Sequence, residues 1–425
     1  MYYQHPHLSP LRPAAFRHSS SLGLPPDRHI KEGLDVTRPL HTLLVPPVPT
    51  LTSSTSTDIK HYKYIGSYNW TETSYPAVII VPGSAPEWTG RSPPIKVTPD
   101  RGVQFVDQNG FRCPSSILLP LFRSVDTLGK TVDWPAIDFV TDRNGLRKLS
   151  RWISGGDVKD FRIDMELAGE HTVLLNRWEA QTRTTFLGKS YGFGFEQATT
   201  AAVPGCEKST GHHRIVKFKF FGLNMVVRYE VDACLPSAPP KIPASRASQS
   251  SNPDDLADAL AGLNITSSKP ANTLAVTSPP SPHASSALPP LLRIVRAGAE
   301  QPQESIIELT TRSENYIHKL NWAEIFPQLY LSQTPHFYTG VHSAGRFFEV
   351  REQRLDSLEM VSQREKAETG LRKLGKVLKM IQEIVVKHGK AGRLSLVCED
   401  GTLKVYERVS MQSCLPAEVM RRFEK

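Results

Sequence analysis

The chain has 425 residues, of which 51 are Lys or Arg and 42 are Asp or Glu, with 34 prolines, five cysteines and a formal net charge of +9 at pH 7. The odd, widely spaced cysteines argue against a disulfide framework, and no stretch approaches the roughly 18 consecutive apolar residues of a spanning helix. We therefore expect an intracellular protein of the nucleus or cytoplasm with no membrane association. The positive charge favours a polyanionic partner such as nucleic acid.

Composition divides the chain into segments. Residues 1–58 are rich in Pro, Ser, Thr and His, which predicts a disordered N-terminal tail. Residues 236–300 include the stretches PSAPPKIPASRASQSS and TSPPSPHASSALPP, which predict a Pro/Ser-rich disordered insertion. Because the cost of closing a loop grows slowly with its length, a compact core tolerates such an insertion. We thus predict one domain formed by two parts, 59–235 and 301–425.

Strand and helix patterns alternate between these segments. In chain order they predict a buried strand at 77–81, a helix at 144–153, a hairpin at 161–167 and 172–175, a second hairpin at 214–220 and 225–235, a strand at 305–312, a helix at 363–388, and a closing hairpin at 394–397 and 403–406. The pattern indicates an α/β (α+β) fold, a single mixed-sheet domain with flanking helices.

The strand at 225–232 carries charged residues in alternation. A period of two places Arg228, Glu230 and Asp232 on one face and apolar residues on the other. Such alternation is most often the solvated face of a strand, and a functional site is the alternative.

The strand at 306–312 repeats the arrangement, with Glu308, Thr310 and Arg312 on one face. If the two strands pair, three carboxylates converge and repel one another unless a cation lies between them. Hard oxygen ligands suit Mg²⁺ or Mn²⁺, and such an ion generates a hydroxide nucleophile for phosphodiester attack.

A third acidic position follows two aromatic residues. The segment Gly192-Phe193-Gly194-Phe195-Glu196 leads into a short predicted helix. Core packing explains the two phenylalanines but not Glu196, so this carboxylate is a further site candidate.

Five motifs together resemble the DXO-type decapping nucleases, 5′-end RNA-processing enzymes on a fold related to the PD-(D/E)XK nucleases. In chain order they are Thr141-Asp142-Arg143-Asn144-Gly145-Leu146-Arg147-Lys148-Leu149, Gly192 to Glu196, Glu230-Val231-Asp232, Glu308-Leu309-Thr310, and Leu329-Tyr330-Leu331-Ser332-Gln333. The resemblance covers roughly residues 59–410 without the insertion. Each motif alone is common, and their shared order carries the resemblance.

The resemblance implies roles for individual residues. The metal ligands it implies are Glu196, Asp232, Glu308 and the backbone carbonyl of Leu309. Glu230 would bind the metal through water or orient the attacking water, and Glu308 would share in catalysis. Arg143 and Gln333 would hold RNA phosphates, since an Arg fork matches phosphate geometry.

One position departs from the family. Thr310 stands where the family has Lys, and a threonine hydroxyl neither deprotonates water well nor supplies a positive charge. Losing one electrostatic stabiliser of a transition state typically costs about 10²–10³ in rate. Arg312 and Arg228, on the charged strand faces, could restore positive charge toward RNA but not act as a base.

The function expected is metal-dependent hydrolysis at the 5′ end of incompletely capped or 5′-phosphorylated RNA, with possible 5′–3′ trimming. RNA is the expected partner, with a 5′–3′ exoribonuclease as a possible second one and the oligomeric state open. The alternative is a catalytically impaired relative that binds RNA or a partner without turnover.

Overall fold

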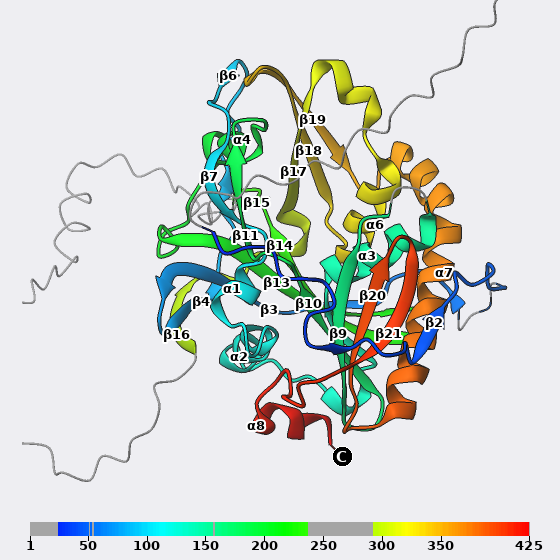
Figure 1. The fold of residues 1–425 in the computed structure, drawn as a ribbon. Helices are drawn as coiled ribbons and strands as arrows, with labels where there is room; N and C mark the ends of the chain where they lie inside the picture. Colours follow the sequence, from blue (N-terminus) through cyan, green and yellow to red (C-terminus); the bar gives the residue numbers. More distant parts are fainter. Residues whose placement is uncertain (1–23, 51, 53–54, 156–157, 237–291, 425) are drawn as a thin grey trace, which may run out of the picture. The chain divides into compact units, whose positions relative to one another are not determined.

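The computed structural model describes residues 24–50, 52, 55–155, 158–236 and 292–424 (Figure 1). Chain contacts divide the protein into two units, Met1–Pro236 with Leu291–Lys425, and Ser237–Pro290. Only the first unit contains described residues. Most of the predicted insertion and the first 23 residues of the predicted tail therefore lie outside them.

A large mixed sheet forms the centre of the described unit. Its strands, in order of pairing, are β1 (Leu34–Asp35), β21 (Thr402–Arg408), β20 (Arg393–Glu399), β9 (Phe161–Ala168), β10 (Thr172–Trp178), β8 (Phe139–Asp142), β14 (Leu223–Val231), β13 (Ser209–Phe220), β3 (Lys60–Ser74), β4 (Ala77–Gly83) and β16 (Leu292–Gly298), with β2 (His41–Leu43) also on β21. The strand β8 runs parallel to β10 and β14, and β16 runs parallel to β4. The other pairs are antiparallel, so the sheet is mixed.

The chain continues into a second, smaller sheet where three strands of the first sheet end. Its order is β12 (Thr200–Ala201), β5 (Glu87–Trp88), β15 (Ala233–Cys234), β17 (Ile306–Ser313), β18 (His336–Ser343), β19 (Arg346–Arg354) and β6 (Ile95–Lys96), and a separate ribbon joins β7 (Arg101–Phe105) to β11 (Arg183–Leu187). The chain passes from the large sheet to the smaller one after β4, after β14 and after β16. Residues at these crossings lie at the junction of the two sheets.

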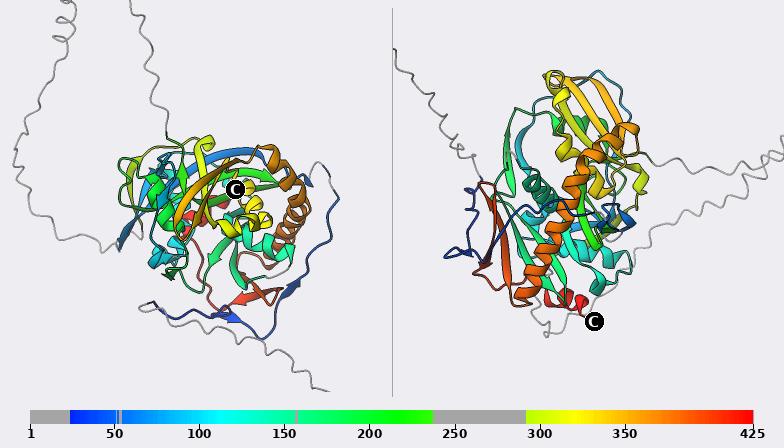
Figure 2. Two further views of the ribbon diagram at one scale, coloured as in Figure 1. Left: turned by 90° about the horizontal axis from the view of Figure 1, so that it is seen from above. Right: turned by 90° about the vertical axis from the view of Figure 1, so that its right-hand side faces the viewer.

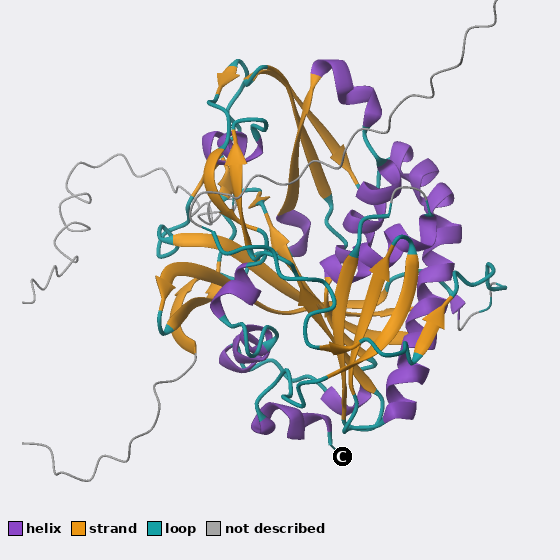
Figure 3. Ribbon diagram, in the orientation of Figure 1, coloured by secondary structure: helices purple, strands orange, loops and turns teal. Residues whose placement is uncertain are grey.

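Helices flank both sheets, and α4 packs on β12 and β17 of the smaller one (Figures 2 and 3). They are α1 (Gln108–Arg112), α2 (Leu119–Thr127), α3 (Arg143–Ser154), α4 (Gly192–Thr199), α6 (Trp322–Ser332), α7 (Leu358–His388) and α8 (Ala417–Met420), with short 3₁₀ turns at Trp134–Ala136, Gln303–Ser305, Glu314–Lys319 and Arg421–Phe423. One core cluster joins α3, α6 and α7 to a sheet face through residues such as Leu149, Leu378 and Val227. A second cluster joins α2 and α8 to the strands through Leu121, Val419 and Val226. The strand β14 is therefore covered on both faces.

The predicted elements are confirmed, with small shifts at their ends. The helix expected at 363–388 starts earlier, at Leu358, and the strand expected at 214–220 starts earlier, at Ser209. The α/β class with mixed sheets and flanking helices is also confirmed, although the strands are divided between sheets. None of the helices in the described ranges combines the length and apolarity needed to cross a bilayer.

Two predicted boundaries were wrong. Part of the predicted tail is ordered, because β1 and β2 pair with β21 and bury Leu34 and Leu43. The end of the predicted insertion is also ordered, since β16 pairs with β4 along its whole length. The strands β1 and β2 are too short to show apolar periodicity, and all three strands are stabilised by partner strands far away in the sequence.

Candidate active site

An acidic cavity of about 800 Å³ opens at the junction of the two sheets. We call it the acidic cavity because six carboxylates line it with one arginine, Arg312. These acids are Glu72, Asp100, Glu196, Glu207, Glu230 and Asp232. Three of them are among the acids singled out from the sequence.

Glu196 is held at the cavity by the packing of α4. Asp100 accepts hydrogen bonds from the backbone N–H groups of Phe193 and Gly194, at 3.3 and 2.9 Å, and so satisfies the start of the helix. The ring of Phe195 is buried, and a Cβ added at Gly340 would lie 2.8 Å from its Cζ atom. A small residue on β18 thus lets Phe195 anchor the helix, and Glu196 points to the cavity.

Glu230 and Asp232 come from the end of β14, where the chain crosses between the sheets. The strand β14 itself does not pair with β17, but its continuation β15 does, with Ala233 opposite Ile307. Extending that antiparallel register by one residue brings Asp232 to β17, and Asp232 Oδ2 accepts a hydrogen bond from the Leu309 N–H at 2.7 Å. The crossing therefore brings the two predicted acidic strands together.

Glu308 lies on β17 and is engaged by two helices. Arg143, the first residue of α3, donates from Nη1 to Glu308 Oε2 at 3.0 Å and to Ser332 Oγ at 3.1 Å. The Nε2 amide of Gln328 on α6 donates to the other oxygen, Oε1. Both oxygens of Glu308 thus have donors, and the Arg143 guanidinium also lies 5.1 Å from the centre of the Tyr229 ring.

The carboxylates lie close enough to raise one another's pKa. Burial, followed by the charges of Glu230 and Glu308, raises the pKa of Glu196 to about 8. Burial, followed by Glu308 and Glu196, raises the pKa of Asp232 well above its usual range. The charges of Glu230 and Glu308 thus act on Glu196, and those of Glu308, Glu196 and Glu230 act on Asp232, so these carboxylates lie near one another.

The environment of Glu230 differs from that of the other acids. The protein atoms around Glu230 partly replace water and so raise its pKa, and the positive charges of Arg177 and Arg143 oppose the rise. Its side chain nevertheless remains exposed, because it stands in a concave wall that is crowded with protein atoms yet open to water. Glu230 is therefore the carboxylate of the cluster most accessible to a water molecule.

The donor set suits a divalent cation chemically. Carboxylates whose pKa is raised by burial and mutual repulsion are stabilised when a cation lies between them. As the side chains stand, no group of three or more His, Cys, Asp or Glu within the described ranges is arranged to hold one metal ion. Glu308 is directed to Arg143 and Gln328, and Asp232 to the backbone of Leu309, so binding requires these contacts to be exchanged or shared.

Thr310 and Arg312 follow on the same strand and line the acidic cavity. Within the described ranges, no carboxylate lies at ion-pair distance from Arg312, so its charge is available to a ligand. Thr310 supplies no charge to the cavity.

The prediction that Arg228 binds RNA was wrong. Its side chain is fully buried, and its Nε and Nη2 donate to both oxygens of Asp142 at 2.6 and 2.9 Å. Its Nη1 donates to the Tyr68 hydroxyl and to the carbonyl of Ile117. Arg228 shares a strand face with Glu230, but there the loop at Ile117 covers that face.

The prediction that Gln333 holds an RNA phosphate was also wrong, because this residue does not line the acidic cavity. Gln333 caps α6 in the left-handed conformation, with φ of 50°, and its amide donates to the carbonyl of Tyr330 in the same helix. The glutamine that reaches the site is Gln328, which sequence reasoning missed. Gln328 and Ser332 are four residues apart on one side of α6, and this spacing is the signal that could have identified them.

The fold is shared with solved structures. Rai1 of S. pombe matches with a TM-score of 0.51 and 12% identity over 86% of this chain and 99% of that chain. Rai1 of Scheffersomyces stipitis, crystallised with (3′-NADP)⁺ and a calcium ion, matches with a TM-score of 0.52 and 11% identity over 90% of this chain and 95% of that chain. Rai1 of Candida albicans, crystallised with pU5 and Mn²⁺, matches with a TM-score of 0.51 and 10% identity over 90% of this chain and 95% of that chain.

These matches confirm the resemblance to the decapping nucleases at the level of the fold. Among curated proteins, no sequence matches this chain significantly. A family model described as "Domain of unknown function (DUF8563)" matches residues 39–424. Because that match spans most of the chain, the protein belongs to the DUF8563 family.

Proposed function

We propose that this protein is a metal-dependent hydrolase that acts on the 5′ end of incompletely capped or 5′-phosphorylated RNA. The observation that carries the proposal is that Glu196, Glu230 and Asp232 line one cavity and Glu308 lies close enough to act on Glu196 and Asp232, on a fold shared with Rai1. The Rai1 structures that contain pU5 with Mn²⁺, or (3′-NADP)⁺ with calcium, support a nucleotide substrate and a divalent cation.

The proposed ligands of Mg²⁺ or Mn²⁺ are Glu196, Asp232, Glu308 and the carbonyl oxygen of Leu309. When bound, the cation supplies a charge that neutralises the phosphate and activates a water molecule. The excess of carboxylates in the cavity repels a polyanion, so a bound cation is also what would allow RNA to enter.

The remaining side chains have roles that follow from their positions. Glu230 is open to water and lies among the other acids, so it would orient the attacking water. Arg143 would hold a phosphate beside Glu308, and Arg312 would do so at the cavity wall. Gln328 would keep Glu308 oriented. A 5′–3′ exoribonuclease partner, 5′–3′ trimming, an intracellular location and the oligomeric state stay predictions.

A second candidate function is RNA or partner binding without turnover. Two observations favour it: Thr310 supplies neither charge nor base, and Glu308 is already engaged by Arg143 and Gln328. The two candidates share the cavity and differ in whether RNA is hydrolysed.

Digestion of 5′-triphosphate RNA and incompletely capped RNA by the purified protein, with Mn²⁺ or with EDTA, tests the proposal. We expect Mn²⁺-dependent release of a 5′ fragment that Asp232→Ala abolishes and Asp356→Ala leaves unchanged, since Asp356 forms an exposed ion pair with Arg354 away from the cavity. Thermal melting checks that both variants fold. If the wild type and Asp232→Ala are equally inert while RNA still binds, the enzyme proposal fails and the binding function remains.

A further inference from the structure

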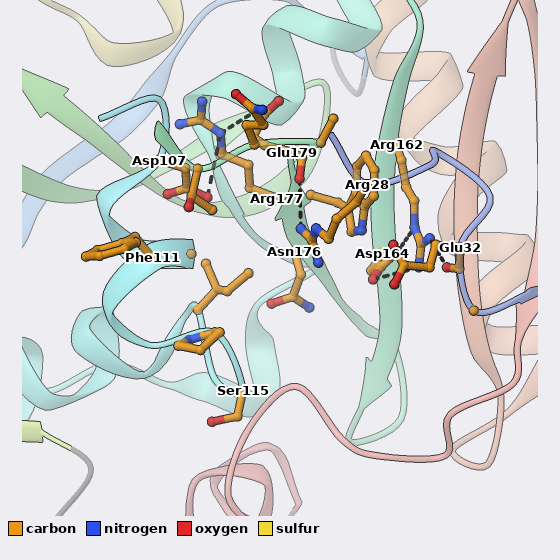
Figure 4. Close-up of a pocket in the computed structure, with 18 of the residues that line it drawn as sticks. Arg28, Glu32, Asp107, Phe111, Ser115, Arg162, Asp164, Asn176, Arg177 and Glu179 are labelled. Atoms are coloured by element: carbon orange, nitrogen blue, oxygen red, sulfur yellow. Dashed lines mark hydrogen bonds and ion pairs between the residues drawn. The ribbon is translucent and has the colours of Figure 1, made fainter. Parts of the chain in front are cut away.

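A second cavity, of about 600 Å³, shares α1 with the acidic cavity (Figure 4). Phe111 on α1 lines this second cavity, whereas Gln108 on the same helix lines the acidic one. Its other walls come from residues between 24 and 33, from the end of β10 and the residues that follow it, and from residues 408–414. We call it the arginine cavity because its lining includes Arg28, Arg162, Arg177, Arg183 and Arg408.

Several charges of the arginine cavity are already paired. Arg162 donates to both oxygens of Asp164, at 2.6 and 3.2 Å. Arg177 donates to Glu179 Oε1 at 2.7 Å, and this oxygen also accepts a hydrogen bond from Lys148 Nζ at 2.9 Å. The first pair lies within β9, and the second links β10 to α3 through Glu179, so these charges are neutralised within the cavity wall.

Arg183 differs from these paired arginines. Its guanidinium lies 4.3 Å from the centre of the Phe111 ring. Within the described ranges, no carboxylate lies at ion-pair distance from it. An aromatic face positions a guanidinium without neutralising it. Arg183 is therefore a positioned cation that an anionic group can approach.

Asn176 adds an unpaired amide to the same cavity. Its side chain is only 4% exposed, and neither Oδ1 nor Nδ2 has a hydrogen-bond partner among the described residues. Figure 4 shows the side chain projecting from β10 into the cavity. The thiol of Cys414 lies near it, but a thiol is a weak partner for an amide.

Asp107 contributes a third unpaired atom, on a second side chain. It is 3% exposed, and its Oδ1 has no hydrogen-bond partner within the described part of the chain. Native proteins pair nearly all buried polar groups, so three unpaired atoms on two side chains lining one cavity call for a partner with both donors and acceptors. The partner must therefore offer hydrogen-bonding groups to Asn176 and Asp107 and a negative charge to Arg183.

We propose that the arginine cavity binds a nucleoside monophosphate. The Asn176 amide offers a donor and an acceptor side by side, which is the pattern that pairs with the edge of a base such as adenine. The guanidinium of Arg183 carries paired N–H donors that can bind two oxygens of the phosphate. The volume lies within the range of roughly 300–1,000 Å³ that is typical of small-ligand sites. The arginine cavity has its own lining, distinct from that of the acidic cavity, and this proposal does not depend on the proposed hydrolase function.

Calorimetric titration of the full-length protein with AMP in EDTA tests the site, with adenosine and inorganic phosphate as partial ligands. We expect one AMP per chain, and affinities at least about tenfold weaker for each partial ligand, because each lacks one of the two contacts. Asp232→Ala should bind AMP like the wild type. No AMP binding at millimolar concentration, or binding that Asp232→Ala removes, would overturn the proposal, the second because it would place AMP in the acidic cavity.

Two variants assign the contacts. Asn176→Leu should weaken AMP binding at least about tenfold while the melting temperature of the free protein stays equal or rises, because leucine removes two unpaired polar atoms from a buried position. Arg183→Ala should weaken AMP binding by a similar factor, and Arg293→Ala, an exposed arginine on β16, should not. If Asn176→Leu melts at a lower temperature and binds AMP normally, the amide is a structural group served by water and the proposal is wrong.

Discussion

Arg143 Nη1 donates a hydrogen bond to Glu308 Oε2 over 3.0 Å and so ties the start of α3 to β17 beside the acidic cavity. The other oxygen of Glu308 accepts a hydrogen bond from Gln328 on α6. Two helices of the large sheet thus hold a carboxylate that belongs to the smaller sheet. The orientation of Glu308 depends on both side chains, and Gln328, which has no proposed contact with RNA, allows this dependence to be measured.

We predict that Gln328→Ala reduces RNA cleavage or Mn²⁺ affinity by about 10–100-fold, the usual cost of removing a group that orients a metal ligand. Gln333→Ala should leave both unchanged, because its amide donates to its own helix. Cleavage assays and Mn²⁺ titrations of the two variants check this matched pair. Equal losses in both variants would show that Gln328 has no special relation to Glu308.

Thr310→Lys should increase Mn²⁺-dependent cleavage of 5′-triphosphate RNA by about 10²–10³-fold, because it restores a positive charge beside the developing charge. Thr402→Lys, at an exposed position on β21 that does not line the acidic cavity, is the control. Single-turnover rates measure the effect. A Thr310→Lys protein that folds and binds RNA but gains no activity would show that the cavity lacks more than a cation.

The metal-free protein should lose stability as pH rises from about 5 to about 8. The pKa of Glu196 is raised to about 8 by burial and by the charges of Glu230 and Glu308. Between its ordinary pKa of 4.5 and this value the folded state holds a proton that the unfolded state has released, so the free energy of unfolding falls as pH rises. The raised pKa values of Asp232 and Glu230 act in the same direction.

Urea unfolding of Glu196→Gln at pH 5 and pH 9 checks this prediction. The variant should be closer to the wild type at pH 5 and more stable than the wild type at pH 9. The control is Glu207→Gln, since backbone N–H groups of Glu207 and Gly205 lower the pKa of this exposed acid. It should show no gain in stability at pH 9. A wild-type profile that is flat from pH 5 to pH 9 would contradict the mutual repulsion of the acids.

Arg228→Met should lower the free energy of unfolding by about 3–5 kcal/mol, because it leaves the carboxylate of Asp142 buried without its partner. Arg312→Met, in the wall of the acidic cavity, should change stability by less than about 0.5 kcal/mol and weaken RNA binding instead. Urea unfolding and RNA titration separate the two effects. An Arg228→Met protein of normal stability with weak RNA binding would restore the role first expected for this residue.

Several features of the site could be read from local pattern. Alternation along β14 and β17 assigned Glu230, Asp232, Glu308 and Thr310 to shared faces, because a strand has a period of two whatever surrounds it. The order of the motifs then indicated the fold, which the Rai1 structures share. Helix and hairpin positions followed from apolar spacing and turn residues in the same way.

Only the tertiary structure decided which distant segment covers each side chain and which groups that side chain contacts. Arg228 and Glu230 share a face of β14, yet one is enclosed beneath Ile117 and the other opens to the acidic cavity, because burial depends on which distant segment lies over each position. Likewise β16 became a strand through pairing with β4. A sequence sets which way a side chain points along its own element, whereas long-range packing sets what that side chain meets.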